Sequence, residues 1–544
     1  MIARRAIRRV LLAAGGLTAA ALVAVTGPAQ ASRPNIIVIQ TDDQNHRTVK
    51  SHFRGPSGRY QPTMPNTAGK IFGKGTEFRN YYTATPVCSP SRASLLTGQY
   101  SHNSGLTGNG GPNGGWEGWR NLPIYEENMP TALQEAGYRT AHVGKFTNGY
   151  YDRENDRVDL TIPPGWNRWF TTAYLPGTRY YGYRVNDNGL AVGPFGNPDY
   201  LSHGPGIDSP RCGRGILLRR GLGGLECNYL PDVMTRRAVR EIRGKKDQPL
   251  FLSIDYQAPH GDIRPPEGPQ PATRHLDSAS RTPIPRPGNF NEPDISDKSP
   301  LIQSYIRRRL NQREIGQMTE AYRRGLESLR SVDEGVGAII RTLRRTGELD
   351  NTYIFYLSDH GYFFGAHRFG LAKFLPFEEA SRVAMAVRGP GIPRGGNSSE
   401  IVGNIDVPAT ILELAGASTG YQVDGRSLRP FWRDPSKTTR RGFEISMESG
   451  VVGGEASAAA RTSAGAPALR YKALRAGPYK YVRYAAGQDE LYDLDRDPLE
   501  LRNKSNSPRY AEVVEYMREQ LREVDECSGE SCRAELPPWP EPGS

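Results

Sequence analysis

Four short apolar runs constrain the fold of this chain more than any other feature, because each run ends in polar residues that can bind ions or move protons. The runs are rich in Ile, Val, Leu and Phe, which is typical of strands buried on both faces of a parallel sheet. Ligands of such sheets bind beyond the carboxyl ends of the strands. The residues after the runs should therefore meet at one edge of the sheet. The runs and these residues are 34–41 with Asp42 and Asp43, 138–143 with Lys145, 249–258 with His260, and 351–357 with Asp359 and His360.

A cysteine segment at residues 85–98 supplies a candidate nucleophile. Cys88 is followed by Ser-Pro-Ser and Arg92, and the small and apolar residues 93–97 predict the start of a helix. The positive end of that helix dipole would stabilise an oxyanion beside Cys88. A buried structural cysteine before a helix is the alternative, since that is the commoner role of a lone cysteine.

The cysteine segment resembles the signature of the type I, formylglycine-dependent sulfatases, and the resemblance extends over nearly the whole chain after its N-terminal segment. In that family the Cys of C-x-P-S-R is oxidised to Cα-formylglycine before folding. The resemblance therefore implies a partner, a formylglycine-generating enzyme that acts on the unfolded Cys88 segment. The hydrated aldehyde, a geminal diol, is the nucleophile in the family, and it divides one displacement into two easier steps.

The resemblance also implies an α/β fold, an alkaline-phosphatase-like sandwich with a large, mostly parallel central sheet. A smaller C-terminal α+β subdomain with a short antiparallel sheet would follow. We place the catalytic domain at 32–440 and the C-terminal subdomain at 441–544, where three short strands and a helix at 508–524 are expected. A long amphipathic helix is predicted at 317–345 from its three-, four- and seven-residue apolar spacings.

A bound divalent cation and a set of charged side chains are implied by the same resemblance. The implied metal ligands are Asp42, Asp43, modified Cys88, Asp359 and His360. Such oxygen-rich sets favour Ca²⁺, and the imidazole of His360 leaves Mn²⁺ or Mg²⁺ as alternatives. The implied catalytic residues are Cys88, Arg92, Lys145, His260 and Lys373. The implied substrate-binding residues are Lys145, His260, His367 and Lys373.

Residues 144–166 resemble the N-acetylglucosamine-6-sulfatase and heparan endosulfatase branch, which carries G-K-Y-L-N-E-Y and then P-P-G-W. Most other branches have a His two residues after the Lys, where this chain has Thr147 beside Asn148. The base that completes the reaction is therefore unassigned. Strand alternation points His142 away from Lys145, so we interpret His142 as a packed core residue.

The predicted function is hydrolysis of sulfate esters, on a sulfated amino sugar or glycosaminoglycan. An arylsulfatase, or a phosphonate or phosphate ester hydrolase of the same superfamily, is the enzymatic alternative. A non-catalytic protein that binds sulfated glycans is the alternative from a different class. The intact modification motif at Cys88 argues against it, because a pure binding protein has no use for the oxidised residue.

Residues 1–31 predict a cleavable signal peptide and therefore a secreted, extracellular protein. The segment has an arginine-rich start, an apolar run at 10–25 and an A-x-A site at 29–31. The apolar run is too short to predict a stable membrane span. The paired arginines at 8 and 9 are compatible with twin-arginine export, and an ordinary Sec signal fits equally well.

The charge and the cysteines agree with an exported enzyme that acts on anions. The formal net charge of +12 suits a sulfated substrate, although an arginine-rich background composition would explain it as well. No helix-turn-helix or zinc-finger pattern occurs, so no nucleic-acid partner is expected. Of the five cysteines, Cys527 and Cys532 are expected to close a short loop, and Cys212 and Cys227 to pair across another. Cys88 remains unpaired, as the formylglycine prediction requires.

Overall fold

The structure is a computed structural model, and it describes residues 33–152, 155, 157–173, 179–195, 228–244, 247–262, 268–306, 308–448 and 469–543. The predicted signal peptide and the predicted Cys212–Cys227 pair lie outside these residues. None of the helices in these residues is long and apolar enough to span a bilayer. The boundary proposed at residues 440 and 441 stays a prediction.

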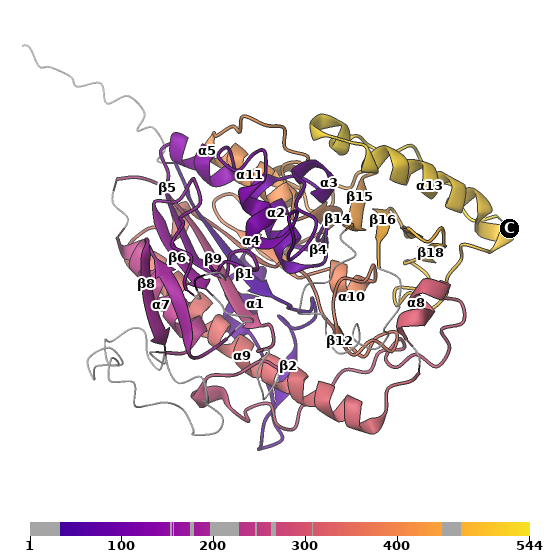
Figure 1. Cartoon of the computed structure of the whole chain (residues 1–544), viewed down its shortest axis with the longest axis horizontal. Helices are drawn as coiled ribbons and strands as arrows, with labels where there is room; N and C mark the ends of the chain where they lie inside the picture. The colour runs from indigo at the N-terminus through magenta and orange to yellow at the C-terminus, as the bar shows by residue number, and fades with distance from the viewer. Residues whose placement is uncertain are drawn as a thin grey trace, which may run out of the picture. The chain divides into compact units, whose positions relative to one another are not determined.

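A ten-stranded sheet forms the centre of the fold (Figure 1), with the order β14-β4-β13-β10-β1-β9-β5-β6-β7-β8. The five consecutive strands β10, β1, β9, β5 and β6 are parallel to one another, and antiparallel pairs flank them on both sides. The strands of this sheet are β1 Asn35–Asp42, β4 Thr76–Tyr82, β5 Arg139–Gly144, β6 Arg168–Ala173, β7 Tyr183–Asp187, β8 Leu190–Phe195, β9 Leu250–Pro259, β10 Thr352–Ser358, β13 Met385–Arg388 and β14 Gly396–Gly403.

The four apolar runs of the sequence are β1, β5, β9 and β10, and they lie side by side as β10-β1-β9-β5. Their registers bring their carboxyl ends to one edge, since Thr41 pairs with Ser358 and Asp42 pairs with Pro259. This arrangement confirms the predicted mostly parallel α/β sheet.

Alternate residues of β1 enter two separate cores, which explains why the strand is apolar on both faces. Ile36 and Val38 pack in one core with helices α2, α4, α5, α11 and α12, whereas Ile37 and Ile39 pack in the other with α7 and α9. The sheet is thus covered by helices on both sides, as expected for a sandwich. The helices are α1 Pro65–Lys70, α2 Cys88–Thr97, α3 Ser101–Ser104, α4 Gly115–Arg120, α5 Met129–Glu135, α7 Leu230–Arg243, α8 Pro300–Tyr305, α9 Gln312–Arg345, α10 Glu378–Ser381, α11 Asp406–Ala415, α12 Arg429–Arg433 and α13 Ala511–Asp525.

The long helix α9 begins at Gln312, five residues before its predicted start. Asn311 and Glu314 form a capping box, in which each side chain accepts a hydrogen bond from the other residue's backbone N–H. This motif fixes the N-terminus of the helix ahead of the first strongly apolar position.

The C-terminal region forms a four-stranded antiparallel sheet in the order β15-β16-β17-β18, with α13 against it. Three of these strands match the three short strands expected from the sequence, and the fourth, β15, was not expected. Three smaller features complete the fold: the β2-β3 pair, the β11-β12 pair, and a disulfide between Cys527 and Cys532, which confirms that predicted link. The bounds are β2 His52–Arg54, β3 Tyr60–Pro62, β11 Phe363–Phe364, β12 Leu371–Ala372, β15 Gly442–Met447, β16 Tyr471–Ala476, β17 Tyr479–Tyr484 and β18 Asp489–Asp493.

Candidate active site

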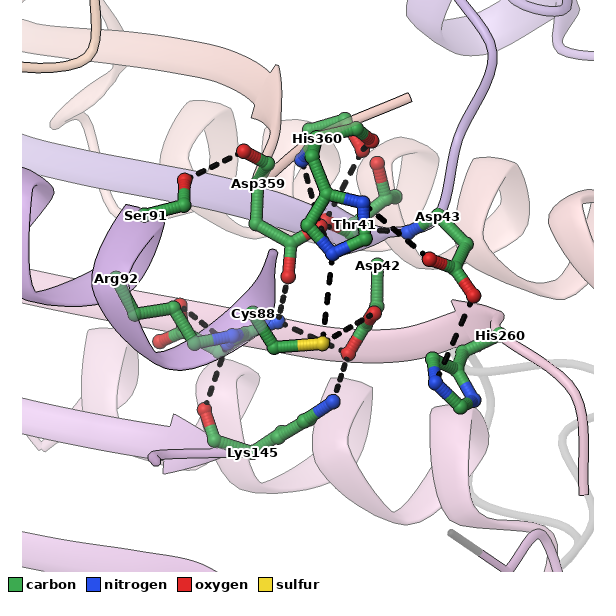
Figure 2. A network of polar contacts seen from close by, with 12 residues as sticks. Thr41, Asp42, Asp43, Cys88, Ser91, Arg92, Lys145, His260, Asp359 and His360 are labelled. Atoms are coloured by element: carbon green, nitrogen blue, oxygen red, sulfur yellow. Dashed lines mark hydrogen bonds and ion pairs between the residues drawn. The ribbon is translucent and has the colours of Figure 1, made fainter. Parts of the chain in front are cut away.

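Cys88 is the first residue of α2 and is completely buried, without a disulfide partner. Its Sγ accepts a hydrogen bond from Lys373 Nζ at 3.3 Å, and lies 3.4 Å from His360 Nε2 and 3.8 Å from Asp42 Oδ1. The sulfur occupies the place where the oxygen of an oxidised residue 88 would stand. The candidate nucleophile therefore faces the carboxyl edge of the sheet (Figure 2).

Asp42 ends β1, and Asp43 follows it in the left-handed backbone region at φ 64°. This turn sends the two adjacent carboxylates to different partners. Asp42 Oδ2 accepts from Lys145 Nζ at 2.5 Å, whereas Asp43 Oδ1 accepts from Lys373 Nζ at 3.1 Å. Each lysine predicted for the site thus contacts its own buried carboxylate.

Arg92 lies one helical turn after Cys88, so both side chains leave the same face of α2. Its Nη2 donates to Asp42 Oδ2 at 3.1 Å and to Asp359 Oδ2 at 2.9 Å. Its Nη1 donates to the Lys145 carbonyl at 2.9 Å. The guanidinium therefore joins α2 to the ends of β1, β5 and β10 (Figure 2).

Asp359 and His360 follow β10, and Ser91 Oγ of α2 donates to the Asp359 carbonyl at 2.5 Å. His360 Nδ1 lies 3.0 Å from the Gly361 carbonyl oxygen, which can only accept, so Nδ1 carries the proton. His360 Nε2 is then directed at Asp359 Oδ1, 3.6 Å away, and at Cys88. An imidazole held in this way is typical of a metal ligand.

His260 follows β9 and is oriented by two backbone contacts. Its Nδ1 donates to the Gly261 carbonyl at 2.7 Å, and Tyr180 donates its hydroxyl to the His260 carbonyl at 2.9 Å. Its Nε2 lies 3.5 Å from Asp43 Oδ2. The imidazole thus faces the cluster from the side of β9, as Figure 2 shows.

The charges of this cluster shift several pKa values strongly. Burial alone would raise the pKa of Asp42, but Lys145 and the other neighbouring cations hold it well below its usual range. Burial and Asp42 would raise the pKa of Cys88, yet Lys145, Lys373 and His360 lower it to about 5. The site therefore stabilises negative charge at residue 88.

The two histidines shift in the opposite direction. Burial would lower the pKa of His360, but Asp359 raises it to about 9. Burial also opposes the charged form of His260, whereas Asp43 raises the pKa of His260 well above its usual value. His260 is therefore suited to hold a proton near neutral pH.

The donor set fits a hard divalent cation. Asp42, Asp359, His360 and Cys88 each offer a ligand atom, and these atoms all lie within 4.8 Å of one another. Asp42 also forms a second such group with Asp43 and His260. Carboxylate-rich groups with one imidazole suit Ca²⁺, Mn²⁺ or Mg²⁺.

The structure does not bring His367 to this cluster. The His367 side chain is completely buried, with Nδ1 2.7 Å from Glu292 Oε2 and its ring stacked on Phe377. Among the described residues, its polar contacts are with Glu292, Asn289 and Glu379. Its predicted contact with substrate stays untested.

The neighbourhood of Lys145 agrees with the interpretation of His142 as a core residue. His142 stacks on Trp169 with 4.5 Å between ring centroids, and its Nδ1 lies 3.3 Å from Asp255 Oδ2. Thr147 is buried, and its hydroxyl has no hydrogen-bond partner among the described residues. No base is evident at that position.

Two groups beside the site were not predicted from the sequence. Asp255 of β9 lies 3.5 Å from Arg92 Nη1, and a carboxylate inside an apolar strand was the only signal for it. Asn148 accepts from the Ser89 hydroxyl at 3.2 Å and donates its backbone N–H to that hydroxyl at 2.9 Å. This pair of bonds fixes the residue that follows Cys88.

Comparisons with known proteins agree with this geometry. The sequence profile of the Sulfatase family matches residues 34–417. An extracellular sulfatase Sulf-1 homolog of Caenorhabditis elegans is 35% identical over 73% of this chain, and the alignment covers 49% of that relative. This chain thus spans about half the length of that relative.

Two further relatives align over most of both chains. An arylsulfatase of Volvox carteri is 32% identical over 95% of this chain and 78% of its own length. The N-acetylglucosamine-6-sulfatase of Homo sapiens is 29% identical over 92% of this chain and 86% of its own length.

Among solved structures, one that contains D-glucosamine-2-N,6-O-disulfate as substrate superimposes with a TM-score of 0.67. It covers 92% of this chain and 98% of that chain at 23% identity, a likeness that concerns the fold.

Proposed function

Because this chain belongs to the sulfatase family, we propose that it is a sulfuric ester hydrolase that acts through an oxidised Cys88. The observation that carries the proposal is the surroundings of the Cys88 sulfur, with Lys373 at 3.3 Å, His360 at 3.4 Å and Asp42 at 3.8 Å. A buried structural cysteine has no need of such charged neighbours.

Oxidation of Cys88 by a formylglycine-generating enzyme would supply a hydrated aldehyde, with one hydroxyl to attack sulfur and a second whose deprotonation expels sulfate. A divalent cation held by Asp42, Asp43, Asp359 and His360 would supply Lewis acidity for the sulfate ester. Ca²⁺ is the cation that we expect, with Mn²⁺ or Mg²⁺ as alternatives.

The chain's own cations hold and neutralise the sulfate group. Lys145 and Lys373 reach the cluster from β5 and from the segment after β12, and both ammonium groups lie against buried carboxylates. Arg92 fixes the positions of Asp42 and Asp359. Positive charge on several sides of a buried site stabilises charge that develops on the transferring group.

His260 is the group that we assign to the leaving oxygen. As the sulfur–oxygen bond to the sugar breaks, the departing oxygen takes the proton from Nε2, and the imidazole becomes neutral. The contact of Nδ1 with the Gly261 carbonyl keeps Nε2 directed at the cluster throughout. General-acid catalysis of this kind contributes about 10²–10⁴-fold in rate.

For the substrate we propose a 6-O-sulfated amino sugar, free or at the end of a glycosaminoglycan. The support is the human N-acetylglucosamine-6-sulfatase, which aligns over 92% of this chain, and the G-K and P-P-G-W segments around Lys145 and Trp166. An aryl sulfate is the second candidate, because the arylsulfatase of Volvox carteri is similar over nearly the whole chain. A secreted location is also proposed, since two relatives named extracellular sulfatases are 35% and 32% identical over 73% and 76% of this chain.

The test combines peptide mass spectrometry across Cys88 with sulfate release, on protein secreted by its own host. The substrates are glucosamine-6-sulfate and an aryl sulfate, and Cys88→Ala is the control. An aldehyde at residue 88 with sulfate release from the sugar would support both parts of the proposal. An unmodified thiol with no turnover of either ester would overturn it and favour a glycan-binding protein.

A further inference from the structure

A group of side chains that could hold a metal ion lies outside the candidate active site and shares no residue with it. His102 comes from α3, Glu444 from β15, and Asp525 is the last residue of α13. One ligand atom from each lies within 4.8 Å of the others. Figure 1 shows α3, β15 and α13 on the side of the molecule that carries the C-terminal sheet.

The hydrogen bonds of His102 leave one ring nitrogen for a cation. Nε2 lies 3.1 Å from the Cys527 carbonyl oxygen, which can only accept, so Nε2 carries a proton. Asn103 Nδ2 donates to the same carbonyl at 2.9 Å, and the disulfide to Cys532 holds that segment. A histidine that donates one N–H to a backbone carbonyl while its other nitrogen faces a carboxylate has the arrangement of a metal ligand.

Glu444 is the second, independent indication of a ligand. Its carboxylate is 0% exposed, and neither oxygen accepts a well-aligned hydrogen bond from the part of the chain that the structure describes. Oε2 lies 3.2 Å from His102 Nδ1. The Nδ1 and Oε2 atoms can be bridged either by a proton or by a metal ion that both atoms bind. Burial would lower the pKa of His102, but the contact with Glu444 raises it, so the proton is the competing occupant.

The local charges favour a divalent cation over a proton between these two atoms. Asp525 and Glu448 bring two more carboxylates near Glu444, and one buried oxygen of Glu448 also lacks a hydrogen-bond partner among the described residues. Lys472 contacts Asp525 and offsets one negative charge. A proton on His102 adds one positive charge beside these three carboxylates, and burial with the neighbouring Glu444 raises the pKa of Glu448. A divalent ion adds two positive charges and would leave all three carboxylates ionised.

We propose that His102, Glu444 and Asp525 bind a divalent transition-metal ion of the Zn²⁺ class. This group is small, with one imidazole and two carboxylates among the described residues. Zn²⁺ takes about four ligands and accepts such a set, whereas Ca²⁺ takes about six to eight oxygen ligands. The ion ties α3, which follows the nucleophile helix, to the C-terminal strand and helix. Its role is structural, and it does not depend on the proposed sulfatase activity.

The experiment measures zinc binding and thermal stability of the full secreted protein after treatment with a chelator and dialysis against Zn²⁺. The variants are His102→Gln and Asp525→Asn, with His52→Gln as a matched control at an exposed histidine of β2. Asp359→Asn alters the candidate active site alone. Asp525 is a partly exposed residue, so its variant keeps the test decisive if His102→Gln does not fold.

His102→Gln and Asp525→Asn are each expected to hold one zinc ion fewer than wild type and His52→Gln. Asp359→Asn is expected to keep the zinc ion that these two variants lose. Zinc in excess should raise the Tm of wild type by about 2 °C or more, and should not raise that of His102→Gln. Equal zinc content in wild type and in both site variants would overturn the proposal. A Tm that His102→Gln lowers without any difference in zinc content would also overturn it, because that result identifies a simple ion pair.

Discussion

Arg92 and Asp359 make a direct charged contact, in which Nη2 donates to Oδ2 at 2.9 Å and both side chains are buried. Arg92 is one helical turn from Cys88, and Asp359 follows the strand β10. This contact therefore holds the nucleophile's helix against the carboxyl edge of the sheet. Because the same guanidinium also donates to Asp42 and to the Lys145 carbonyl, its planar shape serves three partners at once.

Arg92→Lys is expected to lower kcat/KM for a sulfate ester by about 10²-fold or more, with the protein still folded. A lysine keeps the charge but has one ammonium in place of a planar fork, so it cannot reach Asp42, Asp359 and the Lys145 carbonyl together. The measurement is steady-state kinetics with a Tm for each protein.

Arg237→Lys is the matched control for this variant. Arg237 of α7 makes a similar two-pronged contact with Asp187, at 2.9 and 2.7 Å, without touching the candidate site. Equal losses of activity in the two variants would show that Arg92 acts only through general stability.

His260→Ala tests the assignment of the leaving-group acid. The alcohol of a sugar leaves poorly without a proton, whereas the phenolate of a nitrophenyl sulfate leaves well. The variant should therefore lose about 10²–10⁴-fold in kcat on glucosamine-6-sulfate and far less on the aryl ester. Steady-state rates on both esters, with His52→Ala as the control, make the comparison. Unchanged turnover of the sugar ester, or equal losses on both, would remove His260 from this role.

The four inner strands could be predicted from sequence because burial on both faces leaves an uninterrupted apolar run. Ile36 and Ile37 show this directly, since each enters a different core. The polar residues that follow these runs could be assigned to the site, because ligands bind beyond the carboxyl ends of parallel strands. The Cys88 segment was recognisable because its signature residues lie next to one another in the sequence.

Other parts of the site depend on contacts between distant segments, and no local pattern carries them. Two of the partners of His367, Glu292 and Asn289, come from a Pro-rich segment, and no local pattern in that segment predicted the contact. Asp255 sits inside an apolar strand, and its neighbour Arg92 comes from a helix far away in the sequence. Strand β15 was not predicted, because the Gly-, Ala- and Ser-rich sequence that follows it at 449–468 gives no strand pattern.

Replacing Cys527 and Cys532 by serine should lower stability modestly and leave sulfatase turnover unchanged. Their disulfide closes a loop with a sequence separation of 5, and the chain-entropy estimate for so short a loop is about 2 kcal/mol. For a chain of this size, that corresponds to a fall in Tm of about 2 °C. Thermal unfolding of the double variant without added reductant measures the change. A fall of more than about 10 °C would mean that the link does more than restrict the unfolded chain.

Glu327 of α9 should make the stability of the protein depend on pH near neutrality. Its side chain is 2% exposed, and burial raises the pKa of Glu327 to about 7. In the unfolded chain a glutamate titrates near 4.3. Between these two values the folded state holds a proton that the unfolded state has released, so stability falls as pH rises through this window. Above about pH 7 the destabilisation is fully present.

Glu327→Gln removes this titration and retains Oε1, which accepts from the Ala279 N–H at 2.8 Å. The variant should match wild type at pH 5, where both side chains are neutral, and exceed its Tm by about 2 °C at pH 8. Glu519→Gln, at an exposed position of α13, is the control, and its Tm difference from wild type should not grow with pH. A stabilisation by Glu327→Gln that is equal at pH 5 and pH 8 would contradict the shifted titration, because an uncharged effect of the amide would then explain it. A difference that grows between these two values identifies the buried carboxylate as its source.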